Sequence, residues 1–488
     1  MALRFQNSLT RTKEEFEPIE PGKAGLYTCG PTIYNYAHIG NFRAYMFEDL
    51  LRRYLEYRGY AVTHIMNLTD VEDKLIRTAR ETGEPLQAIT ARYAKAFFED
   101  VDTLGIKRAH AYPAATEHIA EMVELIKALR DRGHTYEEGG NIYFKLSTFP
   151  EYGKLAHVEP AELRANASGR TTSDEYERED ARDFALWKAA KPGEPSWDSP
   201  WGPGRPGWHI ECSVMSAKYL GKTFDIHGGG RDLIFPHHEN EIAQSEAAHG
   251  QTMANYWLHN GHVTKDGVKI SKSLGNFIPL RELFETYEPE AVKLFLYSVH
   301  YRSPLDFTDE GLRQAERNLE RFYTALAEAQ KLEPEDTTPD PEAPLARAAS
   351  ELNDKFIQAM DDDFNSARAL AAFFDFLHLL NQQLADKKAR KRKGATAALH
   401  RAAAELKRLG AALGLFQREP GQYLEELKAR RVRLKGLDPA RIKARIQERS
   451  AARKDKDFAK ADRLRAELAE QGVVLEDSPQ GTLWRVEM

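Results

Sequence analysis

The sequence is poor in cysteine, with only Cys29 and Cys212 among 488 residues. Two cysteines can form one disulfide at most, so a disulfide-rich secreted scaffold is not expected. The first twenty residues, MALRFQNSLTRTKEEFEPIE, contain no apolar core and carry acidic residues early. This pattern argues against a signal or transit peptide. We therefore expect a cytoplasmic protein whose thiols stay reduced.

Long hydrophobic runs are also absent. No run of about 18 apolar residues occurs, so we expect no membrane span. The hydrophobic fraction of 42% is nevertheless enough to bury ordinary cores. The length predicts a globular chain of several domains, and we expect it to act as a monomer.

The small net charge of −6 hides an uneven distribution. Residues 387–456 contain 22 Lys and Arg against 7 Asp and Glu, which leaves the rest of the chain strongly acidic. A basic block on an acidic body indicates a polyanionic partner that meets mainly the C-terminal part. The alternative is a set of solvated helix faces, which the charge alone does not distinguish.

The N-terminal region has the pattern of a βαβ unit. Residues 23–29 predict a strand, residues 42–59 a helix and residues 60–68 a second strand. Such a unit opens a doubly wound, Rossmann-type parallel α/β sheet, in which ligands bind at the carboxyl ends of the strands. Cys29 and Thr69 both lie at such ends.

The remaining chain divides by composition. Residues 86–132 predict helices, residues 135–146 a hairpin, and residues 207–221 and 224–235 a return to the sheet pattern. We expect a catalytic domain over 1–310, a helical bundle over 311–415 and a small C-terminal domain over 418–488 that ends in a hairpin. Within them we expect an insertion over about 85–205 and an acidic, proline-rich linker over about 332–344.

Metal-ligand residue types gather in two short stretches. HIECS contains Cys212, and FPHHENE contains His237 and Glu241, which share one face if that stretch is helical. Together with Cys29 they would form a tetrahedral site of the kind that zinc accepts. Without a Cys-x-x-Cys spacing, a polar surface turn remains the alternative.

Three further stretches have features of a nucleotide site. AHIGN (37–41) places His38 and Gly40 where a strand turns into a helix, whose N-terminus attracts anions. KISKS (269–273) carries Lys269 and Lys272, which suit a leaving pyrophosphate. HGGGRD (227–232) predicts a loop with little side-chain bulk for a purine or ribose. Each motif alone is weak, but their order and the βαβ start strengthen one another.

These motifs together resemble the cysteinyl-tRNA synthetase family of the class I aminoacyl-tRNA synthetases. HIGN resembles its HIGH signature and KISKS its KMSKS signature, with Asn41 and Ile270 as the two departures. Further blocks in family order are TCGPTIYNYAHIGN, NLTDVEDKLI, PSWDSPWGPGRPGWHIECS, FDIHGGGRDLIFPHHENEIAQSE, DDDFNSARAL and LEDSPQGTLWR. The likeness covers almost the whole chain.

The resemblance implies a site for each substrate. Zinc would be held by Cys29, Cys212, His237 and Glu241, and the amino acid would be bordered by Thr69 and Trp208. The catalytic residues would be His38, Lys269 and Lys272. ATP with Mg²⁺ would meet His38, Gly40, Asn41, Gly229, Asp232 and Lys272. The tRNA would meet the segment over about 255–310 with its stem, and the helical bundle over 311–415. In the anticodon-binding domain over 418–488 it would meet Arg453, Phe458, Asp462 and Asp477.

The resemblance also implies the reaction, which is activation of L-cysteine with ATP followed by transfer of cysteine to the 3′ end of tRNA(Cys). Zinc would select the thiol, since no segment looks like an editing domain. One alternative is the cysteine ligase of mycothiol biosynthesis, which shares the catalytic core but uses no tRNA. Another is a catalytically silent tRNA-binding paralogue. The basic C-terminal region argues against the first, and the retained His38, Lys269 and Lys272 argue against the second.

Overall fold

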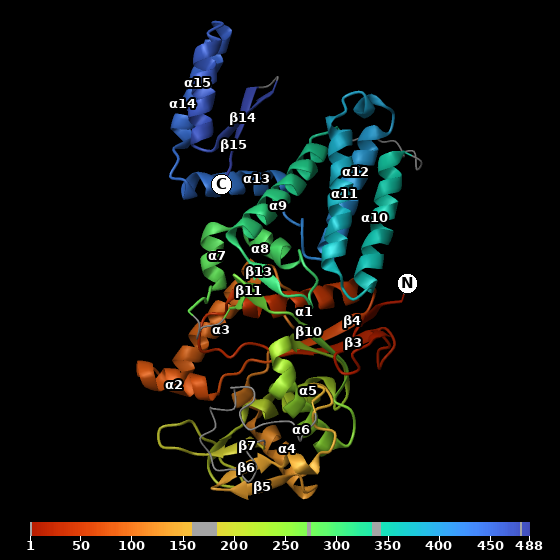
Figure 1. Ribbon diagram of the computed structural model, residues 1–488, viewed down its shortest axis with the longest axis vertical. Helices are drawn as coiled ribbons and strands as arrows, with labels where there is room; N and C mark the ends of the chain where they lie inside the picture. Colours follow the sequence, from red (N-terminus) through yellow and green to blue (C-terminus); the bar gives the residue numbers. More distant parts are fainter. Residues whose placement is uncertain (1, 159–182, 271–274, 334–342, 479–480) are drawn as a thin grey trace.

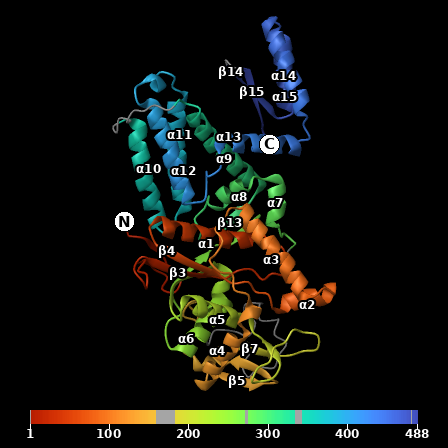
Figure 2. The same ribbon diagram turned by 180° about the vertical axis from the view of Figure 1, so that it is seen from behind.

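The computed structural model describes residues 2–158, 183–270, 275–333, 343–478 and 481–488. The chain is elongated, and its N-terminal half forms the lower part of the molecule (Figure 1). Two separate groups of helices rise from the upper side of this part, and the reverse view shows the same arrangement (Figure 2).

Four parallel strands in the order β10-β9-β3-β4 form the central sheet. Helix α1 lies on one face and helices α5 and α6 on the other (Figure 1). Along β3, Leu26 belongs to the core that contains α1, and Tyr27 to the core that contains α5 and α6. The predicted doubly wound parallel sheet is therefore confirmed. Its elements are β3 (Lys23–Thr28), α1 (Ile39–Tyr57), β4 (Ala61–Met66), α5 (Trp208–Leu220), β9 (Phe224–Gly230), α6 (Glu239–His249) and β10 (Ala254–Asn260).

The prediction of sheet structure over residues 207–221 is wrong, because this stretch forms helix α5. Seven consecutive residues, from Ile210 to Ser216, are buried in it. A helix that is buried all round lacks the apolar stripe of a surface helix, so its periodicity does not distinguish it from a buried strand.

The predicted insertion carries an antiparallel sheet of its own, in the order β5-β6-β7-β8. The predicted hairpin is confirmed, with Gly139 and Gly140 both at positive φ in its turn. The predicted helical stretch over 86–132 is interrupted between Thr103 and Ala115. The elements are α2 (Asp73–Thr82), α3 (Leu86–Thr103), a 3₁₀ turn (Ala115–His118), α4 (Ile119–Asp131), β5 (Thr135–Glu138), β6 (Asn141–Phe144), a 3₁₀ turn (Leu146–Thr148), β7 (Phe184–Ala189) and β8 (Gly204–Pro206).

Small elements complete the lower part of the molecule. The first two strands form an antiparallel pair, and β12-β11-β13 form a three-stranded sheet. Their bounds, with those of the nearby helices, are β1 (Arg4–Gln6), β2 (Lys13–Glu15), a 3₁₀ turn (Arg231–Leu233), a π-helical turn (Ile234–His238), β11 (Val263–Lys265), β12 (Val268–Lys269), α7 (Leu280–Thr286), α8 (Pro289–Leu296) and β13 (Leu305–Phe307).

The C-terminal half is helical except for its last hairpin, which was predicted and is confirmed. The six cations of residues 387–393 lie in the bundle rather than in the C-terminal helices, so the basic block belongs to both groups. Most of the predicted linker lies outside the described residues. The elements are α9 (Asp309–Gln330), α10 (Pro344–Asp361), α11 (Ser366–Ala385), a 3₁₀ turn (Ala389–Lys391), α12 (Ala395–Ala411), α13 (Pro420–Leu434), α14 (Pro439–Lys454), α15 (Phe458–Glu470), β14 (Val473–Ser478) and β15 (Gly481–Val486). None of the helices that the structure describes is long and apolar enough to cross a membrane.

An acidic stretch fastens the bundle to the lower part of the molecule. The carboxylate of Asp363 is buried and accepts hydrogen bonds from the Tyr301 hydroxyl at 2.7 Å and from the backbone N–H of Gln6 at 3.0 Å. Asp361 accepts one from the Tyr54 hydroxyl in α1 at 2.7 Å. The bundle therefore stands over the C-terminal end of α1.

Helix α1 contains a buried carboxyl group, that of Glu48. Its side chain is 0% exposed, and neither carboxyl oxygen has a hydrogen-bond partner among the described residues. Burial raises the pKa of Glu48 from its ordinary value of 4.5 to about 8. The folded chain therefore holds a proton that the unfolded chain has lost. The contribution of Glu48 to the free energy of unfolding is therefore largest below pH 4.5, and this contribution falls by about 1.4 kcal/mol per pH unit until pH 8.

We expect Glu48→Met to raise the thermal unfolding midpoint by about 4 °C at pH 8 and by less at pH 5, because the variant buries no ionisable group. Unfolding scans of both proteins between pH 5 and pH 9 measure the effect. Glu48→Gln is the matched control, since it removes the charge and keeps the buried polar group. Equal pH dependence in the wild type and Glu48→Met would contradict the expectation.

Candidate functional site

Cys29 directly follows β3 at the carboxyl end of the central sheet. Its backbone N–H donates to the Gly228 carbonyl in β9, so it lies where the chain leaves β3 between two neighbouring strands. A Cβ at Gly30 would come within 1.8 Å of the Asn67 carbonyl oxygen. Only glycine permits this approach, which explains the glycine after Cys29.

Four buried side chains meet beside this strand end. The Cys29 and Cys212 sulfur atoms are 3.8 Å apart, and His237 Nε2 is 2.9 Å from Glu241 Oε1. One donor atom from each of the four lies within 4.8 Å of the others. Cys212 comes from α5, His237 from the turn before α6, and Glu241 from the first turn of α6. The structure thus brings together the four residues that the sequence singled out.

The donor set fits a zinc ion. Two thiolates bound at about 2.3 Å in a tetrahedron lie about 3.8 Å apart, which is the separation of Cys29 and Cys212. Two sulfurs, an imidazole and a carboxylate are also ligand types that zinc accepts. The residues present therefore match the group that the resemblance implies.

The protonation of these groups agrees with a site built for a cation. Burial raises the pKa of Cys29, and the hydrogen bond to Cys212 raises it further; burial alone would also raise the pKa of Cys212, but hydrogen bonds from Cys29 and His237 lower it. Burial alone would lower the pKa of His237, but Glu241 and Cys212 raise it to about 10. In the absence of a metal ion, His237 therefore holds a proton that compensates the negative donors. A metal ion would displace this proton.

A ring of histidines, buried except for the half-buried His209, surrounds the four donors, and the sequence analysis did not predict it. His209 contacts His237 through their Nδ1 atoms at 2.8 Å, which leaves Nε2 of His237 on the side of the donors. His227 Nε2 lies 2.7 Å from Glu241 Oε2. His238 contacts His259 at 2.8 Å. The signal that could have revealed this ring is the high histidine density between residues 209 and 259.

These histidines also create a second donor set, formed by Cys29, His227, His238 and Glu241. It shares Cys29 and Glu241 with the first, so one ion at a time can use them. The first set contains both thiols, which suit zinc better than a second imidazole does. We therefore favour the first set.

Two residues predicted to border the amino acid lie next to the donors. The Trp208 ring stacks on the His237 ring at 4.2 Å and is 37% exposed, so it separates the cluster from solvent. The Thr69 hydroxyl is buried and donates to Glu211 Oε2 at 2.8 Å. Glu211, which precedes Cys212, was not predicted, and its other oxygen has no partner among the described residues.

The start of α1 is held by a capping box between His38 and Asn41. The Asn41 N–H donates to His38 Nδ1 at 3.3 Å, and the His38 N–H donates to Asn41 Oδ1 at 3.1 Å. Because Nδ1 accepts, the neutral ring carries its proton on Nε2. A Cβ at Gly40 would lie 2.7 Å from the His38 ring, so glycine is needed there. The asparagine that departs from the HIGH signature thus has a structural role.

The expected glycine-rich loop at residues 227–232 is mostly strand, because residues up to Gly230 belong to β9. A Cβ at Gly229 would lie 2.8 Å from the His238 ring, so this glycine makes room for the histidine ring. Asp232 follows in a 3₁₀ turn at the carboxyl end of β9. The roles of Gly229 and Asp232 in binding ATP remain predictions.

The KISKS segment is described only in part. Lys269 ends β12, and Ile270 is buried at 3% exposure. Lys272 lies outside the described residues. The roles of both lysines therefore remain predictions from the sequence.

The four residues predicted to meet tRNA lie in the C-terminal helices and hairpin. Phe458, which begins α15, is 61% exposed. Asp477 in β14 accepts from Arg449 and Arg453 at 2.8 and 2.6 Å, which keeps the pKa of its carboxyl well below the usual range. Asp462 is exposed on α15. The structure thus holds Arg453 and Asp477 together and leaves an aromatic ring free for stacking.

Comparison with known families divides the chain into three parts. Residues 15–317 match the description "tRNA synthetases class I (C) catalytic domain". Residues 355–417 match "DALR domain", and residues 436–485 match "Cysteinyl-tRNA ligase anticodon binding domain". The four clustered donors and the start of α1 all lie in the first part.

Comparison with curated proteins gives full-length relatives. The chain is 48% identical to the cysteine–tRNA ligase of Geobacter sulfurreducens, with 100% of both chains covered. It is 49% identical to that of Alkalilimnicola ehrlichii, covering 99% of this chain and 100% of the relative. It is 45% identical to that of Thermococcus gammatolerans, covering 99% of each.

Among solved structures, the fold is similar to that of Mycobacterium tuberculosis methionyl-tRNA synthetase in complex with methionyl-adenylate. The TM-score is 0.62 at 18% identity, covering 86% of this chain and 94% of the other. Identity this low shows the fold alone.

Proposed function

The chain belongs to the cysteine–tRNA ligase family of class I aminoacyl-tRNA synthetases, and we propose that it converts L-cysteine and ATP to cysteinyl-adenylate before charging tRNA(Cys), with zinc selecting the thiol. The observation that carries this proposal is the cluster of Cys29, Cys212, His237 and Glu241 at the carboxyl end of β3, from which the chain leads into the N-terminus of α1. A soft-metal site and an anion-binding helix end then share one edge of the sheet.

The cysteine would bind at the cluster. When bound by the four donors, zinc supplies a soft Lewis acid that takes a thiolate in preference to a hydroxyl group. Trp208 covers this side of the site, and its aromatic ring limits access of water. The buried Thr69–Glu211 pair offers polar atoms for the substrate.

ATP, with Mg²⁺, would bind at the start of α1. The first backbone N–H groups of the helix and Nε2–H of His38 are donors for phosphate oxygens. The cysteine carboxylate attacks the α-phosphorus, and the bond to pyrophosphate breaks. Lys269 and Lys272 would offset the negative charge that grows on pyrophosphate. In the second step, a hydroxyl of the terminal ribose of tRNA attacks the cysteinyl carbonyl, and AMP leaves.

The C-terminal residues support a tRNA substrate over the mycothiol-type reaction. Residues 436–485 match an anticodon-binding domain, which an enzyme that joins cysteine to an amino sugar does not need. An exposed aromatic ring such as Phe458 can stack on a base, and Arg453 can hydrogen-bond to base edges.

Two assays on the purified protein test the proposal together. Cysteine-dependent exchange of pyrophosphate into ATP should report adenylate formation, and incorporation of labelled cysteine into tRNA should report charging. Exchange without charging would indicate a ligase that uses another acceptor. Charging of tRNA with neither exchange nor zinc in the protein would contradict the assigned site.

We expect Asn41→Ala to lower kcat/KM for ATP in the exchange assay about tenfold, because the His38 N–H loses its acceptor and the start of α1 loosens, while the bond from the backbone N–H of residue 41 to His38 Nδ1 remains. The helix should lose about 1 kcal/mol of stability with its cap. Asn41→Asp is the matched control, since it keeps a cap acceptor but places a negative charge near the phosphates.

The capping role predicts that Asn41→Asp keeps the thermal midpoint of the wild type and raises KM for ATP. Asn41→Ala should instead lower the midpoint as well as kcat/KM. An Asn41→Ala protein with unchanged midpoint and kinetics would show that the capping box does not matter for catalysis.

A further inference from the structure

A cluster of positive charge lies at the free end of the helical bundle, in the segment KKARKRK (387–393) between α11 and α12 (Figure 1). Six of its seven residues are Lys or Arg, and none is acidic. Arg390 is half-buried, and Ala389 is buried. The fully exposed cations are Lys387, Lys388, Lys391, Arg392 and Lys393.

The protein does little to neutralise this charge. Within the described ranges, no carboxylate lies within ion-pair distance of these five cations. The nearest acid in sequence, Asp386, instead accepts from the backbone N–H groups of Lys388 and Ala389 at 2.8 and 3.0 Å. These two bonds shape the turn, so the segment is ordered and still carries its charge.

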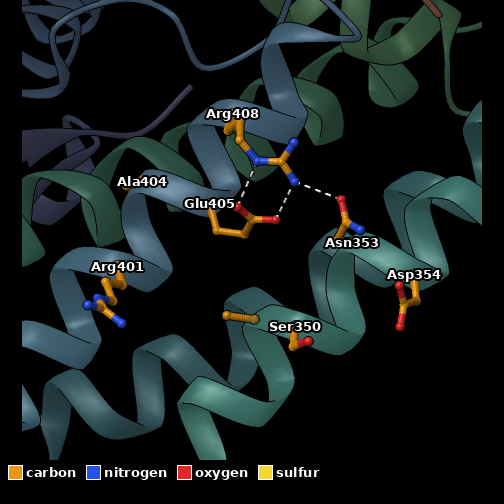
Figure 3. A pocket seen from close by; sticks show the side chains of 8 residues that line it. Ser350, Asn353, Asp354, Arg401, Ala404, Glu405 and Arg408 are labelled. Carbon is orange, nitrogen blue, oxygen red and sulfur yellow. Dashed lines mark hydrogen bonds and ion pairs between the residues drawn. The ribbon is translucent and has the colours of Figure 1, made fainter. Parts of the chain in front are cut away.

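Arg408 is a cation of the bundle whose charge is paired within the protein. A hollow of about 490 Å³ between α10 and α12 contains Arg408, whose guanidinium is held by Glu405 at 2.6 Å and Asn353 at 2.7 Å (Figure 3). This arginine has little capacity left for a ligand. The exposed cations of residues 387–393 therefore differ from Arg408, whose charge is already paired within the protein.

The segment also lies away from the expected path of the substrate tRNA. The bundle stands over the C-terminal end of α1, where Tyr57 meets Asn353 at 2.9 Å. His38 lies at the other end of this 19-residue helix, about 27 Å away. The C-terminal helices start from the side of α7, where Arg430 donates to the Phe284 carbonyl. The line from His38 to the C-terminal domain thus does not pass the tip of the bundle.

We propose that residues 387–393 form a separate surface that binds the phosphate backbone of RNA. Phosphate contacts need positive charge and no apolar surface, and this segment exposes five cations while its one apolar side chain is buried. A protein partner would need apolar side chains at the centre of the contact, which the segment does not offer. The inference does not depend on the proposed zinc or ATP chemistry.

The test uses the full-length protein and a 20-nucleotide oligouridylate that contains no tRNA sequence. The variant replaces Lys387, Lys388, Lys391 and Lys393 with serine. The control replaces four exposed lysines that lie beside acids, Lys23, Lys95, Lys331 and Lys355, with serine. We expect the tip variant to bind the RNA about tenfold more weakly at 100 mM salt. Its slope of log K against log salt should fall by about 2 to 3 units, whereas the control should keep the slope of the wild type.

A charging assay separates two sources of the RNA. A higher KM for tRNA with unchanged kcat in the tip variant would place the segment on the path of the substrate tRNA and would overturn the proposal of a separate surface. An unchanged KM with lost oligouridylate binding would identify another RNA. Equal salt slopes for the variant and the control would overturn the proposal. Competition between poly-glutamate and the RNA at equal charge concentration would also overturn the proposal, because such competition would indicate an acidic protein partner.

Discussion

The Cys212→Ser enzyme should lose zinc and its preference for cysteine together. Serine places a hard, weakly acidic hydroxyl where the cluster needs a second thiolate, and a soft metal binds such a group poorly. We expect kcat/KM for cysteine in pyrophosphate exchange to fall at least about 1,000-fold, since loss of even an outer partner of a metal site costs about 10- to 100-fold. Zinc per chain, measured by elemental analysis, should fall toward zero.

The discrimination against serine should disappear in the same variant. Cysteine and serine differ only in sulfur versus oxygen, so pocket shape contributes little selectivity. Calorimetry should show that cysteine binding is lost while ATP binding is retained, because the His38–Asn41 box at the start of α1 is untouched. Ser216→Ala is the matched control, since this buried serine lies one turn further along α5 and its hydroxyl donates to the Ser213 carbonyl in the same helix.

Two results would contradict the zinc hypothesis. One is a purified wild-type protein that contains no zinc. The other is a Cys212→Ser enzyme that prefers cysteine to serine as strongly as the wild type. His237→Ala provides an independent check, because it removes a different ligand and should give the same combined loss of zinc and cysteine affinity.

Removal of residues 437–488 should abolish efficient charging and spare cysteine activation. The structure places the cut after α13, because that helix is part of the interface with α8 and α9. The Tyr323 and Tyr423 rings stack at 3.8 Å, and Arg418 and Arg430 pair with Glu288. A cut at residue 418 would remove these contacts and expose a buried surface.

We expect the shortened enzyme to keep cysteine-dependent exchange within about twofold and to lose at least about 1,000-fold in kcat/KM for tRNA charging. The charging activity falls because the shortened enzyme lacks both the phosphate contacts and the base stacking of the C-terminal domain. Stacking alone contributes about 1 to 3 kcal/mol per base. Phe458→Ala in the full-length enzyme is the matched point variant, because its ring is 61% exposed and supports no core. It should lower charging about tenfold.

Unchanged charging kinetics in the shortened enzyme would refute this division of labour. A parallel loss of exchange would instead show that the C-terminal domain supports the catalytic domain. The thermal midpoint of the remaining part decides whether such a loss comes from misfolding.

The sequence alone predicted the features that depend on local order along the chain. The parallel sheet followed from the strand–helix–strand pattern of residues 23–68, because periodicity and turn residues are local properties. The glycine pair at Gly139 and Gly140 located a hairpin for the same reason. Resemblance of short motifs then named the residues of the site, since their types and order are written directly in the sequence.

Other features required the tertiary structure. Helix α5 was mistaken for sheet because it is buried all round, and burial is decided by neighbours distant in sequence. The role of Asn41 could not be seen either, because a capping box depends on the side-chain geometry at a helix start. The charge of residues 387–393 was assigned mainly to the C-terminal part until the fold placed it at the tip of the bundle.

The metal cluster shows the division most clearly. The sequence supplied two cysteines separated by 182 residues and a histidine and a glutamate four residues apart, which is a set of ligand types without a site. Only the fold decides that the end of β3, the helix α5 and the start of α6 converge, which brings all four donor atoms within 4.8 Å. The histidine ring that orients His237 and Glu241 also exists only in three dimensions, because its members come from α5, β9, β10 and the turn before α6. Residue types are fixed locally, whereas their distances are set by packing of the whole sheet and its helices.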